Sequence, residues 1–282
     1  MTGIVDTHHH FWHARDHADI WTTDDHSRLV NNYTPDELRP LLWANRVEGT
    51  ILVQSVNEVV ENDRMAAFAR EAPEVRGIVG YLPLYDRKQA FAELERSRVP
   101  HWCGARCLSD DPNLSWALSG DALCVLRHLA ASGLSWDVVV RTRGEAETVA
   151  RVSSMVPSLR IVVDHMCAPS LGTGVLEDWL QRIRLLSQYE AVSMKVSLGV
   201  AVLTPWKVWS STVLDDRIGR VLELFSPDRL MFASNWPVSS LKAPYGTVVQ
   251  DTVGALSRYL SGADLNAVTK YSALSNYQLA EL

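Results

Sequence analysis

Short apolar runs alternate along the whole chain with stretches of helical periodicity, and eight such runs are present. Strands that alternate with helices pair in parallel, because each helix carries the chain back across the sheet. Eight of these units in 282 residues match a (β/α)8 barrel, which typically takes about 250 residues. The runs span residues 3–6, 50–53, 77–82, 102–105, 136–140, 161–163, 192–196 and 230–233.

The competing architecture is a doubly wound open sheet. Such a sheet usually carries a glycine-rich phosphate-binding turn after its first strand, whereas three histidines follow the first run here. Two capping boxes, Thr34 with Glu37 and Thr142 with Glu145, support the predicted helices that follow them. The sequence therefore predicts a single α/β domain over residues 1–282, a (β/α)8 TIM barrel with its active site at the C-terminal ends of the strands.

Charge and hydropathy exclude several classes of protein. Because 27 Lys and Arg stand against 33 Asp and Glu, the net charge is −6, and the basic footprint that general nucleic-acid binding requires is absent. No apolar run approaches the roughly 18 residues of a membrane span, and the first residues lack a signal-peptide pattern. The four cysteines form no CxxC pair, which is typical of reduced thiols. We expect a cytoplasmic protein without nucleic-acid or membrane partners, and an oligomer is compatible with the sequence.

Polar side chains stand at the ends of most predicted strands. A single Arg or His at such a place is commonly a structural hydrogen-bonding group. However, the catalytic residues of a (β/α)8 barrel come from these ends, so their recurrence at most of the strands indicates an active site. The candidates are His8, His10, Gln54, Arg106, Arg141, Asp164, His165, Lys195, Ser197 and Asn235.

The histidines after the first run form a pair. His8 and His10 are two residues apart, so both side chains point to one face of a strand, while His9 points to the other. If the shared face is the barrel interior, two imidazoles converge at its mouth. Such a pair can ligate a metal, act as a general base or bind an oxyanion. We expect His9 to be structural.

Three permanent cations, Arg106, Arg141 and Lys195, are predicted to gather at the mouth although the protein is net negative. Asp164 is the main carboxylate at a strand end, so we expect part of this positive charge to be unpaired. Guanidinium groups bind carboxylates in a bidentate manner. The sequence therefore predicts a small anionic substrate, a carboxylate or a polyoxygenated ring.

Tryptophans near the predicted strand ends are candidates for contact with a substrate ring. Trp206 and Trp209 are three residues apart, and in a helix their rings would share one face and could close over a planar ligand. Trp236 follows Asn235 directly and is expected to pack beneath it, at the edge of the binding site. The long loop 11–32, which carries two further tryptophans, is a candidate lid.

Motifs along nearly the whole chain resemble the lactonase-like branch of the amidohydrolase superfamily, which includes 2-pyrone-4,6-dicarboxylate lactonases and sugar lactonases. Residues 6–12 resemble the opening D-x-H-x-H-F-W, and residues 227–237 are similar to P-D-R-L-M-F-G-S-D-W-P. The segments 104–106, 163–165 and 195–197 resemble further family signatures. The resemblance implies a (β/α)8 fold and hydrolysis of a lactone or related carbonyl.

Departures from the family pattern bear on the chemistry. Asn235 stands where the family has an Asp that activates water or ligates a metal, and an amide is no base near neutral pH. The family's H-x-G-K-P becomes H-M-C-A-P at 165–169, and its R-H becomes Arg106-Cys107. Asn235 is either a substitution introduced to trap a substrate or a natural residue in a homologue whose reaction has changed.

The residues favour no cofactor, with a single divalent metal as the alternative. A binuclear site would need a bridging Lys or Glu where Arg106 and Cys107 stand. One Zn held by His8, His10 and His165 would keep an open position for water. The cations nearby, and the metal-free chemistry that the resemblance implies, favour a site without metal.

Several functions are compatible with this set. The main prediction is a lactonase-like hydrolase in which His8, His10, His165 and Asn235 are catalytic. The alternative is a non-hydrolytic enzyme, an isomerase, cyclase or decarboxylase, in which the histidines transfer protons and the cations stabilise an oxyanion. A catalytically silent ligand-binding barrel is the second alternative, and a Schiff-base aldolase at Lys195 is a remote one.

Overall fold

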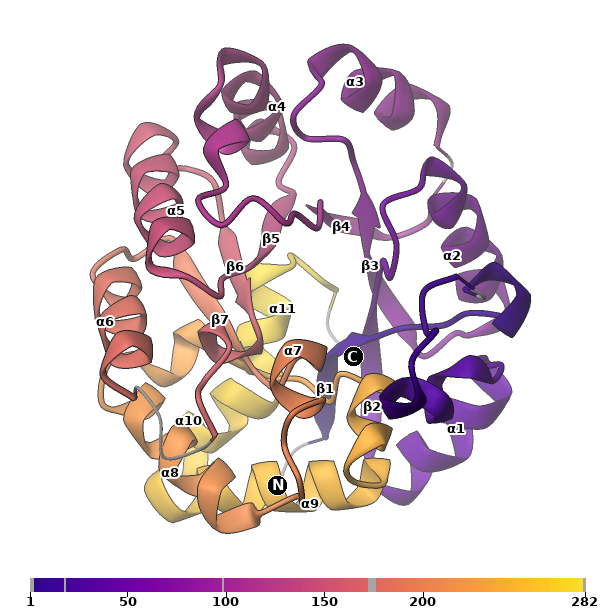
Figure 1. The fold of residues 1–282 in the computed structure, drawn as a ribbon, viewed down its shortest axis with the longest axis vertical. Helices are drawn as coiled ribbons and strands as arrows, with labels where there is room; N and C mark the ends of the chain where they lie inside the picture. The colour runs from indigo at the N-terminus through magenta and orange to yellow at the C-terminus, as the bar shows by residue number, and fades with distance from the viewer. Residues whose placement is uncertain (1–2, 18, 98, 172–175, 281–282) are drawn as a thin grey trace.

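Eight parallel strands form one barrel, as Figure 1 shows. The computed structural model describes residues 3–17, 19–97, 99–171 and 176–280. Each strand pairs with the next along the chain, and hydrogen bonds from Asn235 N to His8 O and from His10 N to Trp236 O, each 2.8 Å, join the last strand to the first. The predicted (β/α)8 fold is confirmed. The strands are β1 (Ile4–His9), β2 (Val47–Val53), β3 (Val75–Tyr81), β4 (Trp102–Arg106), β5 (Ser135–Val139), β6 (Ile161–Asp164), β7 (Val192–Val196) and β8 (Leu230–Phe232).

Helices surround the barrel and cover the outer face of its strands (Figure 1). Both predicted capping boxes are present: Thr34 opens α1 with Glu37, and Thr142 opens α5 with Glu145. No helix among the described residues is long and apolar enough to cross a membrane. The helices are α1 (Pro35–Ala44), α2 (Val59–Glu71), α3 (Arg87–Arg96), α4 (Gly120–Ala131), α5 (Arg143–Met155), α6 (Leu176–Ser187), α7 (Val200–Leu203), α8 (Ser211–Leu222), α9 (Tyr245–Tyr259), α10 (Gly262–Asn266) and α11 (Ser272–Asn276).

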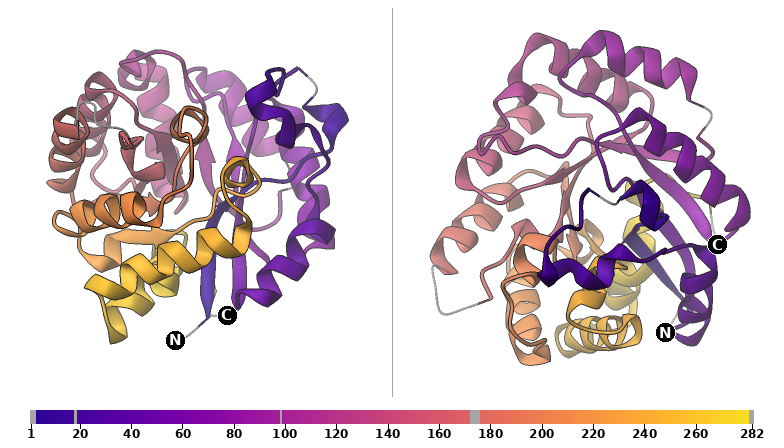
Figure 2. Two further views of the ribbon diagram at one scale, coloured as in Figure 1. Left: turned by 60° about the horizontal axis from the view of Figure 1, so that its bottom comes forward. Right: turned by 45° about the vertical axis from the view of Figure 1, so that its right-hand side comes forward.

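The base of the barrel is filled by side chains from inside the strands and from the C-terminal segment. Ala273 of α11 and Tyr277, both fully buried, pack there against Val5, Ile51 and Met231. Figure 2 shows β1 rising from this base toward the opposite end, where the loop 11–32 and α7 lie. The base is closed by packing, so the open end is the place for a site.

Gly104 leaves space inside the barrel for side chains of the neighbouring strand β5. A Cβ atom at Gly104 would lie 2.2 Å from Ser135 Oγ and 3.1 Å from Asp137 Oδ1. Only a residue without a side chain therefore fits next to β5 at this level. Ser135 Oγ occupies the space that Gly104 leaves, and it donates a hydrogen bond to the Asp137 carboxylate (2.7 Å).

Candidate active site

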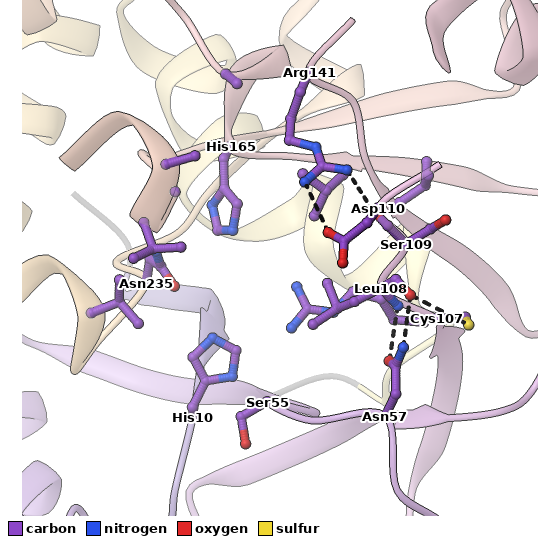
Figure 3. Close-up of a pocket in the computed structure, with 18 of the residues that line it drawn as sticks. His10, Ser55, Asn57, Cys107, Leu108, Ser109, Asp110, Arg141, His165 and Asn235 are labelled. Carbon is purple, nitrogen blue, oxygen red and sulfur yellow. Dashed lines mark hydrogen bonds and ion pairs between the residues drawn. The ribbon is translucent and has the colours of Figure 1, made fainter. Parts of the chain in front are cut away.

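A cavity of about 320 Å³ opens at the C-terminal ends of the strands. Of the predicted site residues, His10, Arg106, Arg141, His165 and Asn235 line it. Figure 3 shows the His10, His165 and Asn235 side chains around the same space, with Arg141 at its far edge. The structure thus brings these five predicted residues together around one cavity.

Other residues that line the cavity are not among the polar strand-end candidates. Trp12 and Trp21 come from the loop after β1, and Ser109 and Asp110 come from the loop after β4. Part of the wall is apolar, formed by Val138, Val139, Val200, Val202 and Val238. A signal for Trp21 was present in the predicted lid, since the loop 11–32 does reach the cavity.

His8 lies below the cavity floor, fully buried in a network of charges. Its Nδ1 is 3.2 Å from Asp164 Oδ1 and 3.3 Å from Lys195 Nζ, and its Nε2 is 3.3 Å from Arg106 Nη1. Burial and the nearby Lys195 ammonium hold the pKa of His8 well below its ordinary value, although Asp164 opposes them. His8 is therefore a neutral member of this network.

Lys195 stands at the centre of the same network. Its Nζ donates to Asp137 Oδ2 (2.6 Å) and lies 3.0 Å from Asp164 Oδ1, and all three side chains are fully buried. Tyr277 Oη donates a further bond to Asp137 Oδ2 (2.6 Å). Burial alone would raise the pKa of Asp164, but Lys195, His8 and Arg106 hold it well below its ordinary value.

The expectation of unpaired positive charge is wrong. Arg106 Nη1 bonds Asp164 Oδ2 (2.7 Å), Lys195 is shared by two carboxylates, and Arg141 Nη2 bonds Glu145 Oε1 (3.0 Å). The expectation failed because it considered only carboxylates at strand ends. Asp137 lies within β5, and Glu145 belongs to the first turn of α5.

His10 presents one free nitrogen to the cavity. Its Nδ1 lies 2.7 Å from the Val53 carbonyl oxygen, which can only accept, so Nδ1 carries the proton and Nε2 keeps its lone pair. Burial and the Arg106 charge hold the pKa of His10 well below its ordinary value, so the ring is neutral at pH 7.

His165 follows β6, and its Nδ1 is paired with Ser197 Oγ (2.9 Å). A hydroxyl can donate or accept, so His165 can present either tautomer to the cavity. Burial lowers the pKa of His165 to about 4; Asp164 opposes the shift, and Arg106 and Lys195 add to it. Ser197 was predicted to bind substrate, but it does not line this cavity and instead orients His165.

A left-handed turn positions His165. Four successive residues, 165–168, have φ values of 58°, 50°, 56° and 49°, a region that non-glycine residues rarely adopt. The indole of Trp179 donates to the Met166 carbonyl (2.6 Å), and Arg182 Nη2 donates to the Cys167 and Ala168 carbonyls (3.1 and 3.2 Å). These bonds from α6 hold a backbone that local preferences oppose.

Asn235 is held in one orientation. Its backbone has φ 55°, its N–H donates to His8 O (2.8 Å), and its carbonyl accepts from Ser239 N (2.9 Å). Its side-chain Nδ2 donates to the Leu198 carbonyl (2.7 Å), while the buried Oδ1 is without a partner in the described residues. Gln54 was also predicted to bind substrate, but it lies outside the cavity, and its main-chain oxygen accepts from Arg106 Nη2.

The predicted tryptophan lid is wrong in its location. α7 ends at Leu203 and α8 begins at Ser211, so Trp206 and Trp209 lie between helices, and neither lines the cavity. Their rings pack together with centroids 5.2 Å apart, and Trp209 Nε1 donates to Asp251 on α9 (2.7 Å). Spacing along the chain could not show which way this segment turns.

Trp236 also lies outside the cavity. Its ring contacts Tyr33 (centroids 5.2 Å apart) and Phe11 (6.1 Å) in a cluster between the barrel and its helices. Trp236 therefore packs behind the end of β8 and does not face the cavity.

Two tryptophans of the loop after β1, Trp12 and Trp21, line the cavity. Trp12 stacks on His17 (centroids 4.8 Å apart) and contacts Trp21 (5.8 Å). Two hydrogen bonds join this loop to the segments after α7 and β8. His26 Nε2 pairs with Thr204 Oγ1 (2.9 Å), and Arg28 Nη1 donates to the Ser240 carbonyl (3.1 Å).

A metal could be sought where His8, Asp164 and His165 bring donor atoms within 4.8 Å of one another. This set differs from the predicted three histidines, because Asp164 takes the place of His10. Both carboxylate oxygens of Asp164 are already held by cations, Lys195 at 3.0 Å and Arg106 at 2.7 Å. A divalent ion that used one of these oxygens would have to compete with the cation that already holds it.

The protein is a parallel eight-stranded barrel whose open end has a cavity lined by histidine, arginine and amide groups. Residues 5–269 match the family model for amidohydrolases (Amidohydro_2), and the chain belongs to this family. The prediction of an amidohydrolase-family hydrolase is confirmed.

Known relatives narrow the class further. The chain is 25% identical to the L-fucono-1,5-lactonase of Burkholderia ambifaria, over 87% of this chain and 84% of that protein. It is 27% identical to the L-fucono-1,5-lactonase of Burkholderia multivorans, over 98% and 96% of the two chains. A structure of an amidohydrolase from Burkholderia multivorans with bound zinc superposes with a TM-score of 0.89 at 25% identity, covering 99% and 100%. That zinc and the His8–Asp164–His165 grouping support a divalent metal as the alternative to a cofactor-free site.

Proposed function

We propose that the chain hydrolyses the lactone of a small hydroxylated ring compound. The observation that carries this proposal is the cavity that His10, Arg106, His165 and Asn235 line, in a chain whose relatives include L-fucono-1,5-lactonases. In such a reaction water adds to the carbonyl carbon and the ring C–O bond then breaks. The chemistry requires a donor for the carbonyl oxygen, an acceptor for the water proton and an orienting group.

Arg106 is the proposed donor for the carbonyl oxygen. Its Nη1 and Nη2 are engaged by Asp164 and by the Gln54 carbonyl, whereas its buried Nε has no partner among the residues that the structure describes. A buried guanidinium fixed in this way is preorganised to stabilise the charge that develops on an oxyanion. His165 faces the same cavity and can assist with its free Nε2.

The polar groups left free favour a neutral, hydroxylated substrate. The cations at the mouth are paired, while Trp21 Nε1 is buried at the cavity wall and has no partner among the described residues. An uncharged donor of this kind matches a substrate hydroxyl group. A buried polar group that a ligand satisfies adds specificity against analogues that lack the matching group.

A comparison of two lactones tests the function and the substrate class together. We expect a higher kcat/KM for L-fucono-1,5-lactone, which is neutral and hydroxylated, than for 2-pyrone-4,6-dicarboxylate, measured by acid release in weak buffer. A higher kcat/KM for 2-pyrone-4,6-dicarboxylate would instead favour the anionic substrate that the sequence predicts. No turnover of either compound, or of five- and six-membered aldonolactones, would leave the non-hydrolytic or silent alternatives.

We further propose that the reaction needs no metal, since Lys195 and Arg106 occupy the carboxylate that would ligate one. Dialysis against a chelator should leave kcat unchanged, and elemental analysis of the dialysed protein should show no stoichiometric metal. Activity that is lost on dialysis and restored by Zn²⁺ would contradict this prediction.

A further inference from the structure

The side chain of Asn235 is oriented by its surroundings. Leu198 O can only accept a hydrogen bond, so the atom 2.7 Å from it must be the amide nitrogen of Asn235. The amide oxygen then points away from this carbonyl, and it is buried in a residue that lines the cavity. It has no hydrogen-bond partner within the part of the chain that the structure describes. The protein therefore offers one fixed acceptor to whatever occupies the cavity.

An aspartate could not adopt the same pose at this position. It would place a carboxylate oxygen 2.7 Å from the Leu198 carbonyl oxygen, and two acceptors at that distance repel. The backbone bonds of residue 235, to His8 and Ser239, hold its main chain in place beside this carbonyl. The contact with Leu198 suits an amide.

The proton acceptor must then come from another residue at the cavity wall. Three histidines were candidates. His8 is fully buried below the floor and has a cation opposite each ring nitrogen. When the Ser197 hydroxyl donates to His165 Nδ1, the ring proton of His165 is on Nε2, which then cannot accept. His10 differs, because the Val53 carbonyl fixes its proton on Nδ1 and leaves the Nε2 lone pair for the cavity.

We propose that Asn235 is a built-in acceptor that orients the attacking water, and that His10 Nε2 takes the proton from this water. This inference rests on the proposed lactone hydrolysis. The water O–C bond forms as the proton moves to His10, and the carbonyl oxygen becomes an oxyanion beside Arg106 Nε. The ring C–O bond then breaks, and the ring oxygen receives the proton from His10, which returns to its neutral form.

The first test is the substitution Asn235→Asp, which would create the carboxylate that the family motif has. We expect kcat/KM for lactone hydrolysis to fall about tenfold or more, since a carboxylate repels the Leu198 carbonyl and its own pose is lost. Asn235→Ala should also lower kcat, because the acceptor is removed. Asn45→Asp is the matched control: Asn45 Nδ2 also donates to a backbone carbonyl, Leu41 O at 2.8 Å, but at the end of α1.

The second test is His10→Ala, which should lower kcat by about 100-fold or more, as expected for loss of a general base. Added imidazole should restore part of this activity, whereas a residue that only supported the fold would not respond to imidazole. Thermal unfolding of each variant separates loss of catalysis from loss of structure.

Three results would overturn the proposal. If Asn235→Asp raised kcat/KM by orders of magnitude, the wild type would lack a carboxylate base and our assignment of Asn235 and His10 would be wrong. The proposed lactone hydrolysis would still hold. Near wild-type activity in His10→Ala would remove His10 from the reaction and leave the lactonase function intact. Inactivity of the wild type and of Asn235→Asp on every lactone would refute the lactonase function itself.

Discussion

Replacing Lys195 with Met should lower the free energy of unfolding by about 3–5 kcal/mol, the range seen when one partner of a buried ion pair is removed. Met keeps the length and most of the volume of the lysine side chain, so the loss comes from charge. Asp137 loses its 2.6 Å partner, and Asp164 keeps only Arg106 and His8. Urea denaturation followed by far-UV circular dichroism measures the change.

Two controls separate charge from packing in this experiment. Adding Asp137→Asn to Lys195→Met should recover part of the stability, because the uncompensated carboxylate is neutralised. Lys270→Met removes an ammonium from a partly exposed pair with Glu48 (2.8 Å), and should cost less than about 1 kcal/mol. Equal losses at the two lysines would contradict the assignment of the buried network as a main source of stability.

Acid should destabilise the protein through its buried histidines. Burial lowers the pKa of His9 to about 3, while an unfolded histidine titrates near 6.5. The unfolded state therefore binds the proton first, and the stability that the neutral ring contributes above pH 6.5 is lost as the pH falls from 6.5 toward 3. At pH 4.5 the loss from His9 alone is about 2.7 kcal/mol, at about 1.4 kcal/mol per unit.

His17 and His165, whose pKa values burial lowers to about 4, add to this slope. His9→Gln removes one titrating ring while its amide can still reach Thr50 Oγ1, which His9 Nε2 contacts at 2.9 Å. The variant should lose less stability than the wild type between pH 7 and pH 4.5. The two proteins are compared by urea denaturation at several pH values, and parallel slopes would contradict the prediction.

The sequence predicted the fold because each of its strands carries a local apolar signal and each helix a local periodicity or cap. It predicted His10, Arg106 and His165 for a related reason, since a strand end projects its residues toward the mouth whatever the loops do. Trp206 and Trp209 failed because the direction of a connection depends on contacts such as that with Asp251, which lie far along the chain.

The charge balance of the site could have been predicted better. Asp137 interrupts an apolar run in a strand, and a carboxylate at such a position is seldom buried without a partner. That signal pointed to Lys195, the lysine within another strand. Tyr277 and the left-handed turn at 165–168 carried no comparable signal, because long-range packing holds the first and bonds from α6 hold the second.

The space beside Gly104 has a consequence for how sequences of this kind can diverge. A Cβ atom at residue 104 would lie 2.2 Å from Ser135 Oγ, the atom that donates to the Asp137 carboxylate, so positions 104 and 135 cannot change independently. A lineage that keeps Ser135 must keep Gly104, while alanine at 104 requires a smaller residue at 135 and so removes the hydroxyl that supports Asp137. Positions 104 and 135 should therefore covary among homologues, and a glycine without chemistry of its own would mark which of them retain this hydroxyl beside the buried charges.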